Sequence, residues 1–406
     1  MKRHILFVGE IQPLWIEFQV LAADSNSGIS GDFFHTVPEA LAAIEKGGFT
    51  AVVADADLPG IGGVELLDTV MRRRPEVRRF VLSDLADIRA TVGCLGRGHH
   101  HLLKPCDTQT LLSALERANG TGSWQPGQAA QELIAEMRRL PSPPTIYFQV
   151  CAEIESPNAS HERIGELIAR DPAISAKVMQ LANSAVFGLQ LQVVHPFEAV
   201  IYIGLETTRS LVLAAHTFSA FDQAQIPNFP IDDLWRHCVI AGRLARQIVR
   251  LERGAAELAD QSFAAGLLHD IGKLLFAANL PQLFRQAVAL AREQGQPLWK
   301  AEREVAHACH AELGAALLAI WGLPAPIVEA VAWHHWPSAS PELRFCPLTA
   351  VHAADVLAHE ARPDPKVPVQ AGLDLDYLEG VGLADRTETW RRNCLADEPL
   401  EAAAND

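Results

Sequence analysis

The sequence predicts a multidomain chain, in which an α/β domain with a doubly wound parallel sheet is followed by an all-helical domain. Three observations support this prediction. At 406 residues the chain is longer than one ordinary domain. Short apolar segments alternate with amphipathic helical patterns over residues 1–120, and helical patterns alone dominate from residue 128 onward. Apolar residues make up 49% and charged residues 20%, which is typical of globular proteins.

Four short apolar segments in the first 120 residues are predicted to be buried strands, namely 5–8, 51–54, 80–82 and 102–103. Helical patterns lie between them, at 38–46, 64–73 and 87–95. Strands that alternate with helices form a parallel sheet with helices on both faces. In such a fold, reactive side chains gather at the carboxyl ends of the strands.

Polar side chains stand where the predicted strands end, namely Glu10, Asp55, Ser83 and Lys104. Because these ends share one edge of the sheet, we expect the four side chains to lie together. Two carboxylates, a hydroxyl and an ammonium at one edge are typical of a phosphorylatable aspartate. We predict that Asp55 is the nucleophile and that Glu10 helps it to hold Mg²⁺. Ser83 and Lys104 would contact the phosphoryl oxygens.

Residues 1–120 resemble the receiver domain of two-component response regulators. Asp55 is followed by Pro59, which matches the family's Asp with Pro four residues later, and Lys104-Pro105 matches its Lys-Pro step. The resemblance implies a flavodoxin-like sheet of five parallel strands. It also implies a sensor histidine kinase that phosphorylates Asp55, and a homodimer, because receivers commonly pair through one face.

The chain departs from the receiver pattern at two positions. Gly9-Glu10 supplies one acid after the first strand, where the family usually has two. His101 occupies the position of the family's aromatic switch residue. The alternative to a phosphorylated receiver is therefore a degenerate one that serves only for docking or dimerisation.

Residues 119–127 are rich in Gly, Ser and Pro and mark the end of the receiver. We predict a linker at 121–130, an all-helical domain at 131–360 and an extension at 361–406. The extension contains one predicted helix, near 387–395, and an acidic tail. Within the helical domain, Ser160 and Asp171-Pro172 are typical of helix N-termini.

The helical region contains three short motifs of distinctive composition, namely Asp171-Pro-Ala-Ile-Ser-Ala-Lys177, Leu181-Ala-Asn-Ser-Ala-Val-Phe-Gly188 and Trp321-Gly-Leu-Pro-Ala325. Through them, residues 130–360 resemble the HDOD family. That family is related to the HD-type metal phosphohydrolases. The resemblance implies an output domain for signalling.

A His-Asp pair, His269-Asp270, lies within an apolar helical run. Buried charges cost several kcal/mol or more unless they are paired or bind a metal. Further candidate ligands lie on both sides of the pair, namely His237, His310, His334, His335 and Asp355. Imidazole and carboxylate together are the ligand set of a divalent metal site. The residues predict either a metal centre or a structural His–Asp network.

The order of these residues resembles the ligand order of HD-type phosphohydrolases, which use a His, a His-Asp pair and a distant Asp. The further histidines resemble those of the HD-GYP cyclic di-GMP phosphodiesterases. The resemblance implies a site for Fe, Mn, Zn or Ni and a water that attacks phosphorus, with Lys273 facing the phosphate. Against catalysis, no Gly-Tyr-Pro signature follows His334-His335. On one helix these two histidines would point apart, so we expect at most one to enter a shared site.

Composition limits the partners and the location. The formal net charge of −15 disfavours non-specific binding to nucleic acid or to an anionic membrane. No apolar stretch is long enough to span a bilayer. The seven cysteines form no Cys-x-x-Cys pair and no secretory signal precedes the first strand, so we expect reduced thiols in the cytoplasm.

These observations predict a response regulator whose HDOD domain is non-catalytic and acts on a downstream signalling protein. The first alternative is a receiver-gated, metal-dependent phosphodiesterase or phosphohydrolase of the HD type. The second is a non-catalytic binder of a cyclic dinucleotide. The sequence does not decide among the three, because kinship of fold does not establish activity.

Overall fold

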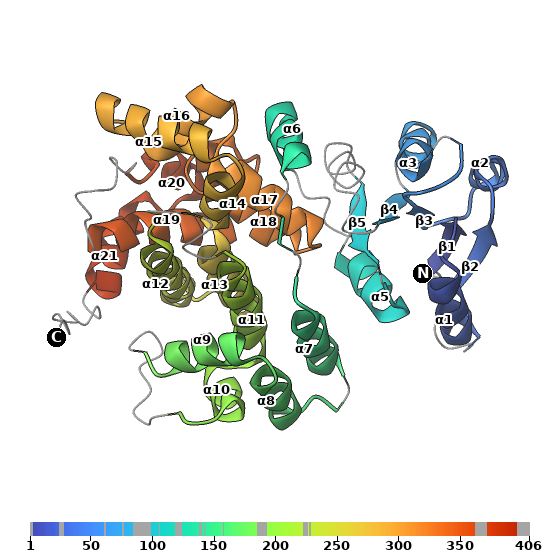
Figure 1. Cartoon of the computed structure of the whole chain (residues 1–406), viewed down its shortest axis with the longest axis horizontal. Helices are drawn as coiled ribbons and strands as arrows, with labels where there is room; N and C mark the ends of the chain where they lie inside the picture. The colour runs from blue at the N-terminus through green and yellow to red at the C-terminus, as the bar shows by residue number, and fades with distance from the viewer. Residues whose placement is uncertain are drawn as a thin grey trace. The chain divides into compact units, whose positions relative to one another are not determined.

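The computed structural model describes residues 3–23, 28–60, 62–74, 77–83, 99–104, 106–117, 124–137, 140–141, 143–156, 158–184, 193–221, 226, 229–361 and 372–395. The chain divides into two compact units, residues 1–136 with 316–325, and residues 137–315 with 326–406. The first contains a parallel sheet and the second is helical, which confirms the predicted fold class (Figure 1).

The sheet of the first unit has five parallel strands in the order β2-β1-β3-β4-β5. The strands are β1 (Arg3–Val8), β2 (Ile29–Phe34), β3 (Ala51–Asp55), β4 (Arg78–Ser83) and β5 (His100–Leu103). The helices described beside them are α1 (Gln12–Ala22), α2 (Val37–Lys46), α3 (Gly62–Arg73) and α5 (Thr108–Arg117). This strand order is that of the flavodoxin-like fold.

Successive residues of each central strand enter different cores. Leu6 and Val52 pack with residues of α2 and α3 on one face, whereas Phe7 and Val53 pack with residues of α1 and α5 on the other. Alternation between two buried faces explains why these strands are apolar throughout. It also leaves their polar residues at the strand ends.

Strand β2 was missed by the sequence analysis. It is an edge strand, and most of its residues are only half-buried, so its sequence Ile-Ser-Gly-Asp-Phe-Phe lacks a continuous apolar run. Gly31 is needed there because a Cβ would lie 2.8 Å from Phe18 Cε1 on α1. The helix predicted at 87–95 lies outside the described residues.

Helices occupy most of the remaining chain, beginning with α6 (Gln128–Glu136), α7 (Thr145–Glu155), α8 (His161–Ala169), α9 (Pro172–Ala182), α10 (Pro196–Ile203) and α11 (Leu205–Ser219). They continue with α12 (Ile231–Leu251), α13 (Ala256–Leu268), α14 (Ile271–Asn279), α15 (Pro281–Gln294), α16 (Leu298–Ala306), α17 (His310–Ile320), α18 (Ala325–Trp333) and α19 (Pro347–Ala361). The predicted N-caps are confirmed: the Ser160 side chain accepts from Arg163 N, and Asp171 accepts from two backbone amides.

The segment after α19 packs on the helical unit. It contains α20 (Leu375–Val381) and α21 (Thr387–Leu395), and α21 contacts both α12 and α19. Arg386 and the Trp390 indole both donate to the carboxylate of Glu252, the latter over 2.8 Å. The predicted acidic tail, residues 396–406, lies outside the described residues. Among the described helices, none combines the length and the hydropathy that crossing a bilayer requires.

Candidate functional site

The carboxyl ends of the receiver strands bring three of the predicted residues together. Asp55 ends β3 and is 2% exposed, and Lys104 Nζ donates to its Oδ1 over 2.8 Å. The backbone amide of Asp57 donates to the same oxygen over 3.1 Å. Ser83 is buried at the end of the adjacent strand β4, and its carbonyl accepts from Lys104 N. The edge therefore holds a carboxylate paired with an ammonium, and a buried serine ends the neighbouring strand.

Glu10 differs from these three because it is exposed, in the turn after β1. Gly9 beside it has φ +115°, and a Cβ there would lie 2.4 Å from Asp55 Cβ. A second acid at this position would therefore be strained and would collide with the side chain of Asp55. The structure gives a steric reason for the departure from the receiver pattern.

The role of His101 stays a prediction. Its backbone belongs to β5 and pairs with Val81 of β4. Its side chain lies outside the described part of the chain, as does Pro105 of the Lys-Pro step.

The helical unit contains a larger cluster, centred on His269-Asp270. The sequence predicted that these two residues lie within one helix, but they do not. Helix α13 ends at Leu268 and α14 begins at Ile271. The break frees both side chains from helical spacing, and His269 Nε2 lies 3.3 Å from Asp270 Oδ2. Both residues are buried.

His237, His269 and Asp355 form a first group. The His237 Nε2 atom lies 3.2 Å from His269 Nε2 and 3.0 Å from Asp355 Oδ1, and His269 Nε2 lies 3.5 Å from the same oxygen. These residues come from α12, the end of α13, and α19. Helices α12 and α13 approach closely because Gly266 faces Gly242, where a Cβ would lie 2.7 Å from the opposite Cα.

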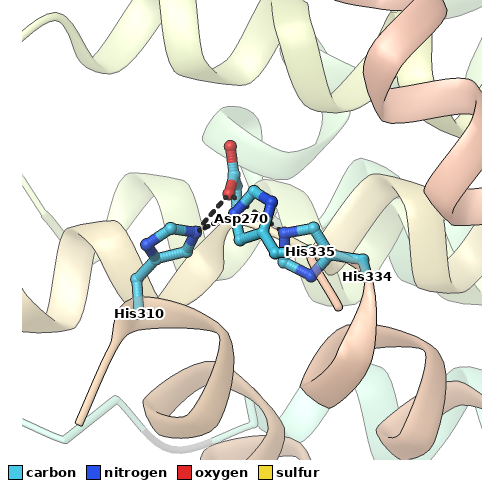
Figure 2. Close-up of side chains that lie close together, drawn as sticks. All are labelled: Asp270, His310, His334 and His335. Atoms are coloured by element: carbon cyan, nitrogen blue, oxygen red, sulfur yellow. Dashed lines mark hydrogen bonds and ion pairs between the residues drawn. The ribbon is translucent and has the colours of Figure 1, made fainter. Parts of the chain in front are cut away.

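Asp270, His310, His334 and His335 form a second group (Figure 2). The His310 Nε2 atom lies 3.2 Å from Asp270 Oδ1 and 2.9 Å from His335 Nε2. His334 Nε2 lies 3.9 Å from the same Asp270 oxygen. Gly272 permits this approach, because a Cβ there would lie 1.8 Å from the His310 carbonyl oxygen.

The expectation that at most one of His334 and His335 enters the site was wrong. Helix α18 ends at Trp333, so the pair lies in the following turn and not on one helix. Outside a helix, adjacent side chains can point the same way. The ring centroids of His334 and His335 lie 3.9 Å apart. His334 Nδ1 is within 2.7 Å of the Val331 carbonyl oxygen, which directs Nε2 into the group.

Asp270 joins the two groups. Its Oδ2 lies 3.3 Å from His269 Nε2 and 3.7 Å from His237 Nε2, whereas its Oδ1 faces His310. Lys273 Nζ also lies 2.5 Å from Oδ2. One carboxylate thus presents an oxygen to each set of histidines.

The residues fit divalent cations. Two ligands that bind one cation at about 2.0–2.2 Å are themselves about 3–4 Å apart, which matches the separations in both groups. Among the described residues, the buried His334 Nε2 has no hydrogen-bond partner, and the buried Asp270 Oδ1 has only the ion-pair contacts with His310 and His334. Such atoms cost about 1–3 kcal/mol each when unsatisfied. A cation between them would satisfy both.

The ionisation states of His334, His335 and Asp270 favour the same interpretation. Burial lowers the pKa of His334 to about 3, and it also lowers the pKa of His335, so both rings are neutral near pH 7 and carry a lone pair. Burial opposes ionisation of Asp270, but His269 and Lys273 hold its pKa well below the usual value. Neutral imidazoles and ionised carboxylates are the forms that bind metals. Although burial opposes protonation of His269 and His310, Asp270 raises the pKa of the first and Glu302 raises the pKa of the second, so a bound cation competes with a proton at these two rings.

Two residues close to the cluster were missed by the sequence analysis. His359 Nε2 lies 3.4 Å from Asp355 Oδ1, and its ring stacks on His237 with centroids 4.3 Å apart. Its spacing from Asp355, one helical turn on α19, was a signal available in the sequence. Glu302 is buried against His310, but it comes from another helix and lies in a charged run, so no local signal marked it.

Family comparisons agree with this architecture. The response regulator receiver domain model matches residues 17–116, and the HDOD domain model matches residues 140–337. The chain carries a receiver domain followed by an HDOD domain. The HDOD match includes every residue of the cluster from His237 to His335, whereas Asp355 and His359 lie beyond it.

The chain also has relatives with known sequences and structures. An uncharacterized protein of Treponema pallidum (strain Nichols) is 28% identical over 203 residues, which is 50% of this chain and 39% of that protein. The uncharacterized transcriptional regulatory protein YesN of Bacillus subtilis (strain 168) is 33% identical over 89 residues, 22% of this chain and 20% of that protein. The chain therefore spans less than half the length of these curated relatives.

One solved structure shares the fold of the helical region. It is an HDOD domain protein of unknown function from Geobacter sulfurreducens, with a TM-score of 0.52 and 24% identity. The match covers 66% of this chain and 88% of that chain. At this identity the likeness concerns the fold alone.

Proposed function

We propose that this response regulator accepts a phosphoryl group on Asp55 and passes the signal to its HDOD unit. The observation that carries the proposal is the buried Asp55 carboxylate paired with Lys104 at the edge of the sheet. A receiver domain implies a phosphodonor partner such as a histidine kinase.

The contacts of Asp55 indicate which oxygen reacts. Among the described residues, Lys104 Nζ and Asp57 N both donate to Oδ1, which holds the carboxylate in place and leaves Oδ2 to attack phosphorus. The bond from Oδ2 to phosphorus forms as the bond to the donor's leaving group breaks. Lys104 then neutralises charge on the phosphoryl oxygens. Mg²⁺ held by Asp55 and Glu10 would supply further neutralisation.

Incubation with a small phosphoryl donor and Mg²⁺, followed by phosphate-affinity electrophoresis, tests this proposal. We expect one phosphoryl group per chain in the wild type and none in Asp55→Asn. Asp57→Asn is the matched control, because this neighbouring acid contacts Asp55 only through its backbone amide. Labelling that persists in Asp55→Asn would refute the assignment.

The output mode is a separate question. The sequence favours a non-catalytic domain that acts on a downstream signalling protein, within a homodimer. Partner capture that depends on Asp55 would support this mode. A chain that is monomeric at micromolar concentration in both phosphorylation states would exclude the homodimer.

A second candidate function is metal-dependent phosphohydrolysis. The specific observation in its favour is the joining of the two His/Asp groups by Asp270. When bound, divalent cations supply Lewis acidity and a more acidic water for attack on phosphorus. The side chains of Lys273, His237 and His359 are 15%, 14% and 20% exposed, more than the other members of the cluster. A phosphate ligand would therefore meet these three first, and Lys273 would offset its charge.

Metal analysis and turnover distinguish these candidates. Purified protein loaded in turn with Fe, Mn, Zn and Ni is assayed for bound metal and for hydrolysis of a cyclic dinucleotide and of an aryl phosphate. Bound metal with turnover supports the phosphohydrolase. Bound metal with nucleotide binding but no turnover supports a nucleotide sensor. Protein that binds none of these metals would support the third candidate, a signalling adaptor without a metal site.

A further inference from the structure

We propose that Glu302 is the positioning residue for the second of two cations, and that it acts through His310. This inference rests on the proposed metal site and goes beyond it, because it makes the two cation positions chemically unequal. Glu302 lies on α16 and is 0% exposed.

The hydrogen bonds of Glu302 orient His310. Its Oε2 accepts from the His310 backbone amide over 2.9 Å and lies 2.6 Å from His310 Nδ1. A proton held on Nδ1 leaves the lone pair on Nε2, the atom that faces Asp270 and His335. The same carboxylate thus sets the tautomer, the ring direction and the backbone position of this ligand.

Other histidines of the cluster are oriented by neutral groups. His269 Nδ1 lies 2.7 Å from the Gly266 carbonyl oxygen, and His334 Nδ1 lies 2.7 Å from the Val331 carbonyl oxygen. A carboxylate is a stronger acceptor than a carbonyl and makes the imidazole a more basic ligand. Among these three, His310 is therefore the ligand whose donor strength depends on an acidic side chain.

The charges of the two positions give a second reason. The first group has Asp355 and shares Asp270 Oδ2, whereas the second has Asp270 Oδ1 as its own carboxylate and meets Asp355 only at 3.7 Å from His335 Nδ1. Lys273 offsets part of that shared charge from 2.5 Å. Glu302 restores a full negative charge beside the second group, and burial limits its screening by water.

Helix α16 also covers this group. The Trp299 ring stacks on His335, with planes inclined by 13° and centroids 5.9 Å apart. The Arg303 guanidinium lies 4.9 Å from the Trp336 ring centroid. Helix α16 therefore holds His310 through the hydrogen bonds of Glu302 and covers His335 with Trp299. It forms one side of the second cation position.

The test compares full-length wild type, Glu302→Gln, Glu302→Asp and Glu312→Gln after removal of metal and titration with Mn²⁺ alone. Glu312→Gln is the matched control, because Glu312 accepts from the Cys309 amide over 3.0 Å but contacts no ligand ring. Bound Mn²⁺ is counted by plasma mass spectrometry and equilibrium dialysis. Circular dichroism of the metal-free proteins establishes that each variant is folded.

We expect two Mn²⁺ per chain in the wild type and in Glu312→Gln. In Glu302→Gln, one of the two ions should bind about 10–100-fold more weakly while the other is unchanged. Glu302→Asp, which keeps the charge, should recover part of the loss. Equal weakening of both ions, or none, would overturn the inference while leaving the metal site standing.

Wild-type protein that binds no Mn²⁺ would overturn both the inference and the proposed metal site, so the two failures are distinguishable. A measurement on wild-type protein covers the case in which Glu302→Gln does not fold. In the Zn²⁺-loaded protein, ¹⁵N spectra of histidine should show His310 with a proton on Nδ1. A proton-free Nδ1 would exclude the role of Glu302.

Discussion

The edge of the receiver sheet and the His/Asp cluster of the helical unit both gather ionisable side chains, but by different means. Asp55, Ser83 and Lys104 meet because parallel strands end at one edge, so their proximity follows from the topology. The cluster draws on several separate helices, and its proximity depends on where those helices cross. The strand-end site therefore follows from the order of the strands, whereas the helical site depends on where a few helices approach closely.

The largest expected effect comes from the residue that joins the two groups. Asp270→Asn removes the shared negative charge but keeps the size of the side chain. We expect both cations to be lost, with affinity reduced by about 100-fold or more. Bound metal per chain is the measurement, and Asp57→Asn in the receiver is the control. Retention of either cation would mean that Asp270 does not serve both groups.

The next prediction concerns helix crossing. Gly272→Ala places a Cβ 1.8 Å from the His310 carbonyl oxygen, a backbone atom that cannot move without shifting α17. We expect the free energy of unfolding of the helical unit to fall by about 3 kcal/mol, together with weaker metal binding. Chemical denaturation measures the first effect. Gly372→Ala, where no atom lies within 4 Å, should leave both unchanged.

The receiver offers the complementary test. Gly9→Asp introduces the second acid of the receiver pattern, but at φ +115° and against Asp55. We expect destabilisation of about 1–3 kcal/mol and less phosphorylation of Asp55, because strain outweighs the added carboxylate. Phosphorylation with Mg²⁺ and thermal denaturation check both effects. Faster phosphorylation than in the wild type would show that the turn can rearrange.

The smallest expected effect is a pH dependence of the receiver. Burial, with help from Arg79 and Arg78, lowers the pKa of His100 to about 4, so this ring is neutral when folded. Because the unfolded chain binds the proton more readily, stability falls as the pH drops from about 6.5 toward 4. We expect a loss of about 1–2 kcal/mol between pH 6.5 and about 5. His100→Phe should flatten the profile, and an unchanged profile would contradict the assignment.

Part of this molecule could be predicted from local patterns. The apolar strands 5–8 and 51–54 signalled the sheet because their residues are buried on both faces. Strand β2 escaped because it is an edge strand with a half-exposed surface. The order of polar residues at the strand ends was sufficient to place Asp55 beside Lys104, since the topology does the rest.

The helical site shows the limit of such patterns. Residue types and their order along the chain marked His237, His269-Asp270 and Asp355 as candidate ligands. The break between α13 and α14, and the turn that directs both His334 and His335 inward, were not visible in the helical periodicity.

The sequence by itself determined the division into an α/β unit and a helical unit, and it marked the candidate phosphoacceptor and the candidate ligands, because these depend on local periodicity and residue type. Only the tertiary structure decided which ligands converge, that Asp270 lies between the two groups and that Glu302 supports His310. Glycines permit two of these approaches, that of α12 to α13 and that of Gly272 to His310. Contacts between residues far apart in the sequence cannot be recognised from the periodicity of apolar residues.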